Sequence, residues 1–370
     1  MPFTEDDYRT AVRSCRFCPM CHHADLVTTL TRRETTSPRG RGLTLFALEQ
    51  GKLSWDASVA DVLYRFTADG LSRHVCAGHI NHDEMVIEGR RRVASAGAAP
   101  EAVGRVRANI EKTGNPWGEA DPGPERALGI KARRRDAAVL VVLGPAARVR
   151  RPEAARAFGR LLERAGLVPA VLDEEGDPGL LLYQLGLPEP AHAAARTLAE
   201  KIRASGAREV VTPDPDVYRT LTAGFGDFPG LGKAAAVRHA AEFLETLARE
   251  GRLKFRPPAA KTAYHDPCAL ARFSPLIAPP RALIKAVSGR DPLELPWNRE
   301  AAACSGECGG LPFTYPDLAR AAAERRAAQA RETGAEVLIT AGPGTAHHLA
   351  QAGGGFAKDL TEWTAECLVG

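Results

Sequence analysis

The sequence predicts an α/β fold: a duplicated α/β module with parallel-type sheets, which follows a mostly irregular or helical N-terminal domain. Two observations carry this prediction. Strand and helix patterns alternate from residue 137 onward, which is typical of a mainly parallel sheet. The order of these elements then returns a second time along the chain, which indicates an internal repeat.

The N-terminal part differs from the rest. Residues 1–90 are polar and have little periodic apolar pattern, so we expect metal ligation rather than a hydrophobic core to hold them together. Residues 91–136 are predicted to be a linker, with a helix over 101–114 and a Pro- and Gly-rich loop over 115–129. The arginine runs at 90–92 and 133–135 are predicted to be solvated linker residues.

The predicted modules cover residues 137–260 and 261–370. In the first module, strands are expected at 137–143, 167–172 and 207–212, with helices at 152–166 and 189–206. The repeat is visible because 191–221 aligns without gaps with 319–349, and VVLGPAA at 141–147 corresponds to AYHDPCA at 263–269. The segment 232–251 is predicted to join the two copies as a helix.

The cysteines fall into two groups of four, and none lies between residues 77 and 267. In the first group, Cys15, Cys18 and Cys21 have CxxCxxC spacing and Cys76 is the remaining thiol. Three ligands from one loop and a fourth from far away fit a cubane iron–sulfur cluster, so we assign these four to one 4Fe–4S cluster. A zinc site is the alternative, and the nearby histidines that could join it are His22, His23, His74, His79 and His82.

The second group consists of Cys268, Cys304, Cys308 and Cys367. Cys268 follows a predicted strand, at the edge where α/β folds bind ligands. Cys304 and Cys308 flank a turn that contains glycine, which lets the backbone approach a cluster closely. These four thiols therefore predict a second metal site, whose type the spacing leaves open between 4Fe–4S, 3Fe–4S and zinc.

Composition excludes several classes of function. A net charge of +4 and a pI of about 8.6 are too mild for nucleic-acid binding. The longest apolar run is too short to span a bilayer, and no signal peptide opens the sequence, so we expect a cytoplasmic protein whose thiols stay reduced. No strand is followed by GxGxxG, so we expect no flavin or NAD site in this chain.

At the cysteine motifs the sequence resembles a family of two-module cysteine-rich iron–sulfur proteins. The family includes the glycolate oxidase iron–sulfur subunit, the lactate-utilisation iron–sulfur protein and the catalytic subunit of heterodisulfide reductase. The motifs that carry the resemblance are CRFCPMC, SPRGRG at 37–42, HVCAGHINHDEMV at 74–86, AYHDPCALARF and AAACSGECGGLPF. The resemblance implies a ferredoxin-like domain over 1–90, a linker, and two cysteine-rich repeats.

The sequence departs from the family pattern at several ligand positions. Asp25 occupies the fourth cysteine position of the first ferredoxin motif, and Cys76 is the one cysteine left in the second. The first repeat lacks cysteines, with LGPAA, EEGDPG and TPDPD at the empty positions, so it is expected to be a scaffold. In the second repeat Thr345 replaces the final cysteine, and the fourth ligand is left open between Cys367, His265 and His347.

These observations favour an iron–sulfur electron-transfer subunit of an oxidoreductase, with one or two 4Fe–4S clusters. It would relay electrons to or from a flavin-dependent dehydrogenase or another redox subunit. Two alternatives stay open: a reductase with its own C-terminal iron–sulfur active site, and a zinc-stapled binding protein without redox activity.

Overall fold

The computed structural model describes residues 3–15, 18–133 and 139–369. Its two sheets are four-stranded and entirely parallel, with strand orders β2-β1-β3-β4 and β6-β5-β7-β8. The two sheets have the same order, because β5, β6, β7 and β8 take the places of β1, β2, β3 and β4. This shared order confirms the duplicated α/β fold. The strands are β1 (Leu140–Val141), β2 (Ala170–Val171), β3 (Glu209–Thr212), β4 (Ala236–His239), β5 (Thr262–His265), β6 (Leu293–Glu294), β7 (Val337–Thr340) and β8 (Ala357–Asp359).

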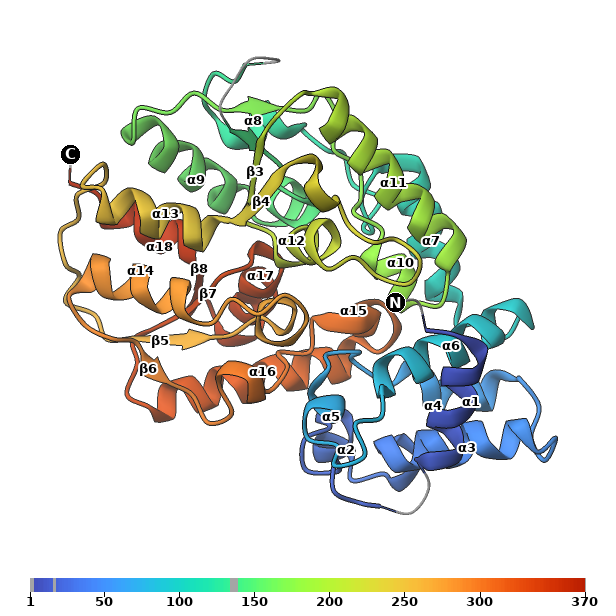
Figure 1. Ribbon diagram of the computed structural model, residues 1–370. Helices are drawn as coiled ribbons and strands as arrows, with labels where there is room; N and C mark the ends of the chain where they lie inside the picture. Colours follow the sequence, from blue (N-terminus) through green and yellow to red (C-terminus); the bar gives the residue numbers. More distant parts are fainter. Residues whose placement is uncertain (1–2, 16–17, 134–138, 370) are drawn as a thin grey trace.

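The helices of the modules repeat as well. In both copies a one-turn π-helix follows the first strand, and long helices connect the strands on both faces of the sheet (Figure 1). The first module contains η2 (Ala146–Arg150), α9 (Pro152–Arg164), α10 (Leu180–Gln184), α11 (Pro188–Ala204), α12 (Pro215–Thr222), η3 (Gly232–Ala234) and α13 (Ala240–Arg249). The second contains η4 (Ala269–Phe273), α14 (Ala278–Ser288), η5 (Arg299–Ala301), η6 (Cys308–Gly310), α15 (Leu311–Thr314), α16 (Pro316–Glu332), α17 (Pro343–Gly353) and α18 (Leu360–Glu366).

The modules are joined by an exchange of helices across a pseudo-twofold axis. Helix α18 of the second module packs on α9 of the first, and α13 of the first packs on α14 of the second. Their shared core includes Phe158, Leu244, Leu283 and Trp363, each almost fully buried. The predicted joining helix over 232–251 was partly wrong, because its first half contains strand β4 and only α13 is helical.

The strand ladders correct the sequence alignment by one residue. Leu140 of β1 lies beside Val210 of β3, and Ala263 of β5 lies beside Leu338 of β7. Because Val210 and Leu338 are equivalent in the repeat, Leu140 corresponds to Ala263, and Pro145 rather than Ala146 corresponds to Cys268. Proline occurs near this position in both copies, which is why the sequence alone favoured the wrong register.

The N-terminal part is helical, and it has an apolar core, continuous with that of the first module, which the sequence did not lead us to expect. Tyr8, Val12, Leu45, Leu63 and Met85 are fully buried in it. Figure 1 shows this part, coloured blue to cyan, beside α10 and α15. Its helices, with those of the predicted linker, are α1 (Glu5–Ser14), α2 (Leu26–Thr31), η1 (Glu34–Thr36), α3 (Pro38–Glu49), α4 (Ala57–Tyr64), α5 (Leu71–His74), α6 (His82–Ser95), α7 (Glu101–Thr113) and α8 (Pro124–Leu128). The predicted helix over 101–114 is confirmed, and the predicted loop contains the short α8.

Candidate metal centre

The four N-terminal cysteines come together although they are far apart in the sequence. Cys15 ends α1, Cys18 and Cys21 follow in the next loop, and Cys76 follows α5. Burial, and after it the neighbouring Cys76 and Cys18 thiols, raises the pKa of Cys15 to about 12. Burial likewise raises the pKa of Cys21 to about 12, with Cys15 and Cys76 again contributing. Neighbouring thiols that resist ionisation in water become good ligands once a metal replaces their protons.

The SPRGRG motif forms the wall behind Cys15. Ser37 caps α3 by accepting a hydrogen bond from the Gly40 amide (2.9 Å), and Pro38 occupies the first turn. A Cβ atom at Gly42 would lie 2.3 Å from the carbonyl oxygen of Cys15 and 3.0 Å from its sulfur. Glycine is therefore required at this position, because any side chain would displace the first cysteine.

Asp25, at the position of the missing fourth cysteine, has a structural role. One carboxylate oxygen accepts the Thr28 amide (2.8 Å) and caps α2. The other pairs with Arg41 at 2.8 Å, and both side chains are almost fully buried. The Arg41 guanidinium also lies 4.6 Å from the ring centroid of Phe66. This buried ion pair occupies the place of the lost thiol, which is consistent with Cys76 as the fourth ligand.

Among the neighbouring histidines, His82 contacts a cysteine sulfur. Its Nε2 lies 3.1 Å from Sγ of Cys15, and burial lowers the pKa of His82 to about 4, so the imidazole is neutral. His22 faces Glu34 at 3.6 Å, and the His23 ring contacts Trp297 in a tilted arrangement with ring centroids 5.5 Å apart. His74 and His79 are exposed. His82 is thus placed to form a hydrogen bond with a ligand sulfur.

Three of the four C-terminal cysteines also come together. Cys268 follows β5 and Cys308 begins η6, and the structure joins the two in a disulfide. Their Cα atoms are 7.7 Å apart, which is wider than the roughly 4.4 to 6.8 Å of ordinary disulfides and suits two sulfurs that face a shared ligand. Cys304 packs with Cys308 and accepts the Gly306 amide at 3.2 Å, and burial raises the pKa of Cys304 to about 12.

The proposed fourth ligands have other neighbours in the structure, and His347 lies against the backbone of Arg150. Cys367 ends α18 inside the core between the modules, next to Glu366 and Lys358. His265 is buried and accepts a hydrogen bond from Arg326 Nε at 3.1 Å. Among the described residues, no group of three or more His, Cys, Asp or Glu side chains is arranged to hold a single metal ion. Cluster thiolates bind different irons and so lie farther apart than the ligands of one ion.

A cavity of about 90 Å³ lies between the modules at the carboxyl ends of β1, β3, β5 and β7. Cys268 and Cys308 line it together with four carboxyl groups, and none of its described lining residues is basic. Burial raises the pKa of each of these acids, to about 6 for Asp177 and to about 8 for Glu307. The four acids are Asp177, Asp214, Asp216 and Glu307.

One carboxyl group of the first module, that of Asp177, stands where the repeat would place a ligand. Gly179 and Gly310 both have left-handed φ at the start of equivalent helices, α10 and α15, so Asp177 corresponds to Cys308. In the sequence, EEGDPG and TPDPD were recognisable as empty positions, but the position of their acids opposite the surviving thiols was missed. The run of acids at former ligand positions was the signal available.

A buried guanidinium fixes the cysteine loop against the rest of the chain. Arg90 is fully buried and makes no ion pair in the part of the chain that the structure describes. It donates hydrogen bonds to backbone carbonyls of all three parts, those of Leu63, Tyr64, Phe66, Gln184 and Gly309. Burial lowers its pKa to about 10. The prediction that Arg90 is a solvated linker residue was wrong; residues 134–135 of the other arginine run lie outside the described residues.

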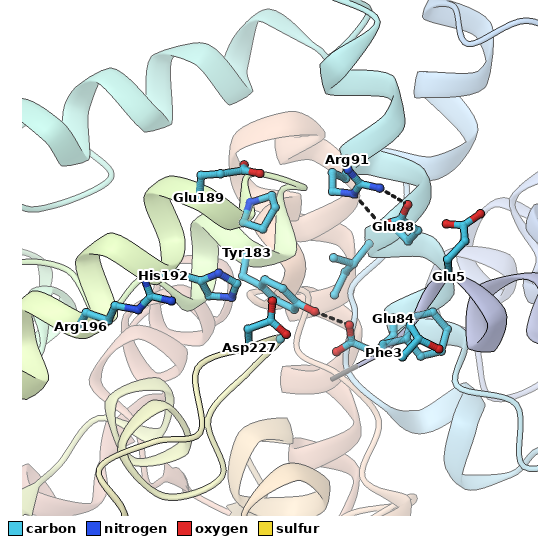
Figure 2. A pocket seen from close by; sticks show the side chains of 14 residues that line it. Phe3, Glu5, Glu84, Glu88, Arg91, Tyr183, Glu189, His192, Arg196 and Asp227 are labelled. Carbon is cyan, nitrogen blue, oxygen red and sulfur yellow. Dashed lines mark hydrogen bonds and ion pairs between the residues drawn. The ribbon is translucent and has the colours of Figure 1, made fainter. Parts of the chain in front are cut away.

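A larger cleft, of about 580 Å³, lies between the N-terminal part and the first module (Figure 2). Tyr183 donates a short hydrogen bond to the buried Glu84, and Arg91 pairs with Glu88 beside them. No cysteine lines this cleft among the described residues. It is therefore separate from the candidate metal centre.

Comparison with known proteins agrees with this geometry. Residues 262–350 match the cysteine-rich domain family, CCG. The chain is 29% identical to a probable membrane-anchored ferredoxin of Chromohalobacter salexigens, over 77% of this chain and 44% of the relative. It is 26% identical to the probable iron-sulfur-binding oxidoreductase FadF of Bacillus subtilis (71% and 39%). It is also 29% identical to one of the subunits of the dihydromethanophenazine:CoB--CoM heterodisulfide reductase of Methanosarcina barkeri (57% and 54%). These matches support the resemblance of this chain to the two-module cysteine-rich iron–sulfur proteins.

The chain matches about half of the length, or less, of these curated relatives. A solved structure of a hypothetical protein from Helicobacter pylori has the same fold, with a TM-score of 0.57 and 10% identity over 89% of this chain and 68% of that one. Within the described residues, none of the helices is both long and apolar enough to cross a membrane.

Proposed function

We propose that this chain is an iron–sulfur electron-transfer subunit of an oxidoreductase, which relays electrons to or from a flavin-dependent dehydrogenase. The observation that carries the proposal is the convergence of Cys15, Cys18, Cys21 and Cys76 around one place. These four would hold one 4Fe–4S cluster, and Cys268, Cys304 and Cys308 would hold a second. Such clusters accept and release single electrons. The relatives named as ferredoxin and as iron-sulfur-binding oxidoreductase support this proposal.

The residues around the N-terminal thiols suit this role. Cys15 and Cys21 are buried, so water is excluded from that side. The Cys15 sulfur also has His82 as a hydrogen-bond partner. Hydrogen bonds to ligand sulfurs and burial are the means by which a protein sets a cluster potential.

The two candidate sites are joined by direct packing. Leu26 of α2, five residues after Cys21, packs in one small cluster with Cys304 and Cys308. Arg272 donates to the Asp69 carbonyl (2.6 Å) and the Ala302 carbonyl (2.8 Å), and so ties the Cys304 loop to the N-terminal part. An electron relay needs its centres held at a fixed separation, and these contacts provide it.

A second function is favoured by the acidic cavity. A reductase needs proton donors beside its redox groups, and burial raises the pKa of the four carboxyl groups near Cys268 and Cys308, so that Glu307, with a pKa of about 8, holds its proton at neutral pH. The relative named as a heterodisulfide reductase subunit is in line with this alternative.

The decisive test is anaerobic purification followed by iron, sulfide and zinc analysis, with EPR spectra after reduction. We expect about eight irons and eight sulfides per chain, and loss of about half of each in Cys76→Ala and in Cys304→Ala. Stoichiometric zinc without an EPR signal would contradict the redox function and leave the zinc-stapled protein. Substrate-dependent oxidation of the reduced chain alone would instead favour the reductase.

A further inference from the structure

The N-terminal thiol site reaches the surface on one side. Cys15 and Cys21 are buried, whereas Cys18 is exposed and Cys76 is partly exposed. Met20, between the two cysteines of the same loop, is 54% exposed, which is unusual for a large apolar side chain. The face around Cys18 and Cys76 therefore combines a reachable sulfur with an apolar side chain that no described part of the chain covers.

The charge along the two cysteine-bearing segments is almost entirely of one sign, and the exposed carboxylate beside them, Glu34 of η1, lies 3.6 Å from His22. The two segments that carry the four cysteines, 13–31 and 70–82, contain a single carboxylate, Asp25, and it is buried against Arg41. The same segments present Arg13, Arg73 and the exposed His23, His74 and His79. Arg13 and Arg73 form no ion pair in the part of the chain that the structure describes. In a sequence with 49 basic and 45 acidic residues, such a one-sided region is not a property of the whole surface.

The basic side chains lie close to the thiols because the chain connects them directly. Arg13 is two residues from Cys15, and Arg73 is three residues from Cys76. An extended chain advances about 3.5 Å per residue, so the two pairs of Cα atoms are within roughly 7 Å and 11 Å. The face continues onto the second module at Trp297, which is 40% exposed and whose ring contacts His23 at a tilt of 46°.

We propose that this face docks a redox protein that presents an acidic surface around its own electron-carrying group. The inference rests on the proposed electron-transfer function. An exposed apolar centre of Met20 and Trp297 with a charged rim has the composition of a protein interface. Like charges on the rim steer an oppositely charged partner and raise its association rate. Docking here brings the partner to Cys18 and Cys76, the sulfurs nearest to solvent.

The same positive charges could instead serve only to offset the charge of a bound cluster. That role changes the cluster potential but makes no distinction between protein partners. The two roles are therefore separable by comparing an acidic protein donor with a small neutral donor.

The experiment measures reduction of the anaerobically purified full chain by stopped flow. The protein donor is a reduced acidic plant-type ferredoxin, and the small donor is photoreduced 5-deazariboflavin. We expect the rate with ferredoxin to fall at least tenfold between 0.05 and 0.5 M salt, and a further tenfold or more in the Arg13→Glu/Arg73→Glu variant at low salt. The rate with deazariboflavin should change less than twofold in both cases.

A matched control moves the same charge change to another face. Arg160 and Arg203 are exposed on helices of the first module, and Arg160→Glu/Arg203→Glu should leave the ferredoxin rate unchanged within twofold. Trp297→Ala should lower the rate at every salt concentration, because it removes apolar contact rather than charge.

Two outcomes would overturn the docking proposal. One is a ferredoxin rate that is insensitive to salt and to Arg13→Glu/Arg73→Glu while deazariboflavin still reduces the chain. The other is equal loss of rate with both donors, together with a shifted potential in a redox titration. If deazariboflavin reduces nothing in any variant, the proposed electron-transfer function itself fails.

Discussion

The two α/β modules share one strand order and one set of helices, yet they differ completely in their loops at the carboxyl ends of the strands. The second module places Cys268, Cys304 and Cys308 there. The first has Pro145 and Asp177 at the positions of Cys268 and Cys308. Because the cysteine-free copy keeps the sheet and its buried helices, the fold does not depend on the thiols. The ligands belong to loops that can change while the core stays.

The largest difference between the modules should be metal content. Cys308→Ser should lose about four irons per chain, since it removes one ligand of the second cluster. Asp177→Asn, at the equivalent position of the first module, should lose none. Iron and sulfide analysis of anaerobically purified protein measures both. An equal loss of iron in the two variants would mean that the carboxylate is a ligand and that the modules do not differ as proposed.

The next largest effect should come from the residue that links the modules. Arg90→Met leaves five backbone carbonyls without their donor, which we expect to lower the free energy of unfolding by roughly 3 to 5 kcal/mol. Arg91→Met, which removes an exposed pair with Glu88, should cost less than about 1 kcal/mol. Urea unfolding followed by circular dichroism compares them, and similar midpoints would contradict the assigned role of Arg90.

The next effect is on the pH dependence of stability. It concerns Glu307, whose counterpart in the first module, Gly176, has no titratable side chain. Burial raises the pKa of Glu307 to about 8, whereas an unfolded Glu titrates near 4.3. Between these values the folded state holds more protons than the unfolded state, so the contribution of Glu307 to stability falls as pH rises. Relative to the parent, Glu307→Gln should gain up to about 4 kcal/mol between pH 5 and pH 8.5. Urea midpoints at both pH values test this, and the exposed Glu332→Gln should show no such trend.

The smallest effect on stability is expected from a double substitution that tests which residues of the two modules are equivalent. Pro145→Cys/Asp177→Cys places two thiols at the positions equivalent to Cys268 and Cys308, with a stability change of about 1 kcal/mol or less. Because the equivalent Cys268 and Cys308 are spaced for a shared ligand, we expect a soft metal ion such as Cd²⁺ to bridge the new pair, measured as two fewer titratable thiols. Ala146→Cys/Asp177→Cys follows the register read from the sequence alone and should keep both thiols free. Pairing in the second variant and not in the first would reverse the assigned equivalence.

Much of the fold could be predicted from the sequence, because the spacing of apolar residues and the positions of turn-forming residues depend directly on local secondary structure. Strand, helix and Pro-containing turn recurred in both modules, and the strand order confirmed the duplication. The N-terminal core could not be predicted, because Tyr8, Leu45 and Met85 lie on separate helices and meet only in three dimensions. The helix over 232–251 hid strand β4, since its Ala-rich start has no turn signal before the helix.

The candidate site was predictable to a similar degree. The spacing of Cys15, Cys18 and Cys21 identified one loop, and the count of thiols identified Cys76, which lies beside them. The grouping of Cys367 with the C-terminal cysteines rested on number alone, and α18 carries it into the core instead. Neither the buried carboxyl groups around Cys308 nor the role of Arg90 leaves a pattern in the sequence, because both depend on contacts between distant segments.

The hydrogen bonds of Arg90 also determine which contacts can form first while the chain is being synthesised. Its guanidinium lies in the N-terminal third of the chain, but one of its carbonyl partners belongs to Gly309. While the polypeptide emerges from the ribosome, the hydrogen bond to Gly309 cannot form until more than two hundred further residues have appeared. The N-terminal helices can collapse early, yet their interface closes only after the second module is present. The proposed metal site at the N-terminal thiols would therefore have a period during translation in which that interface is still open.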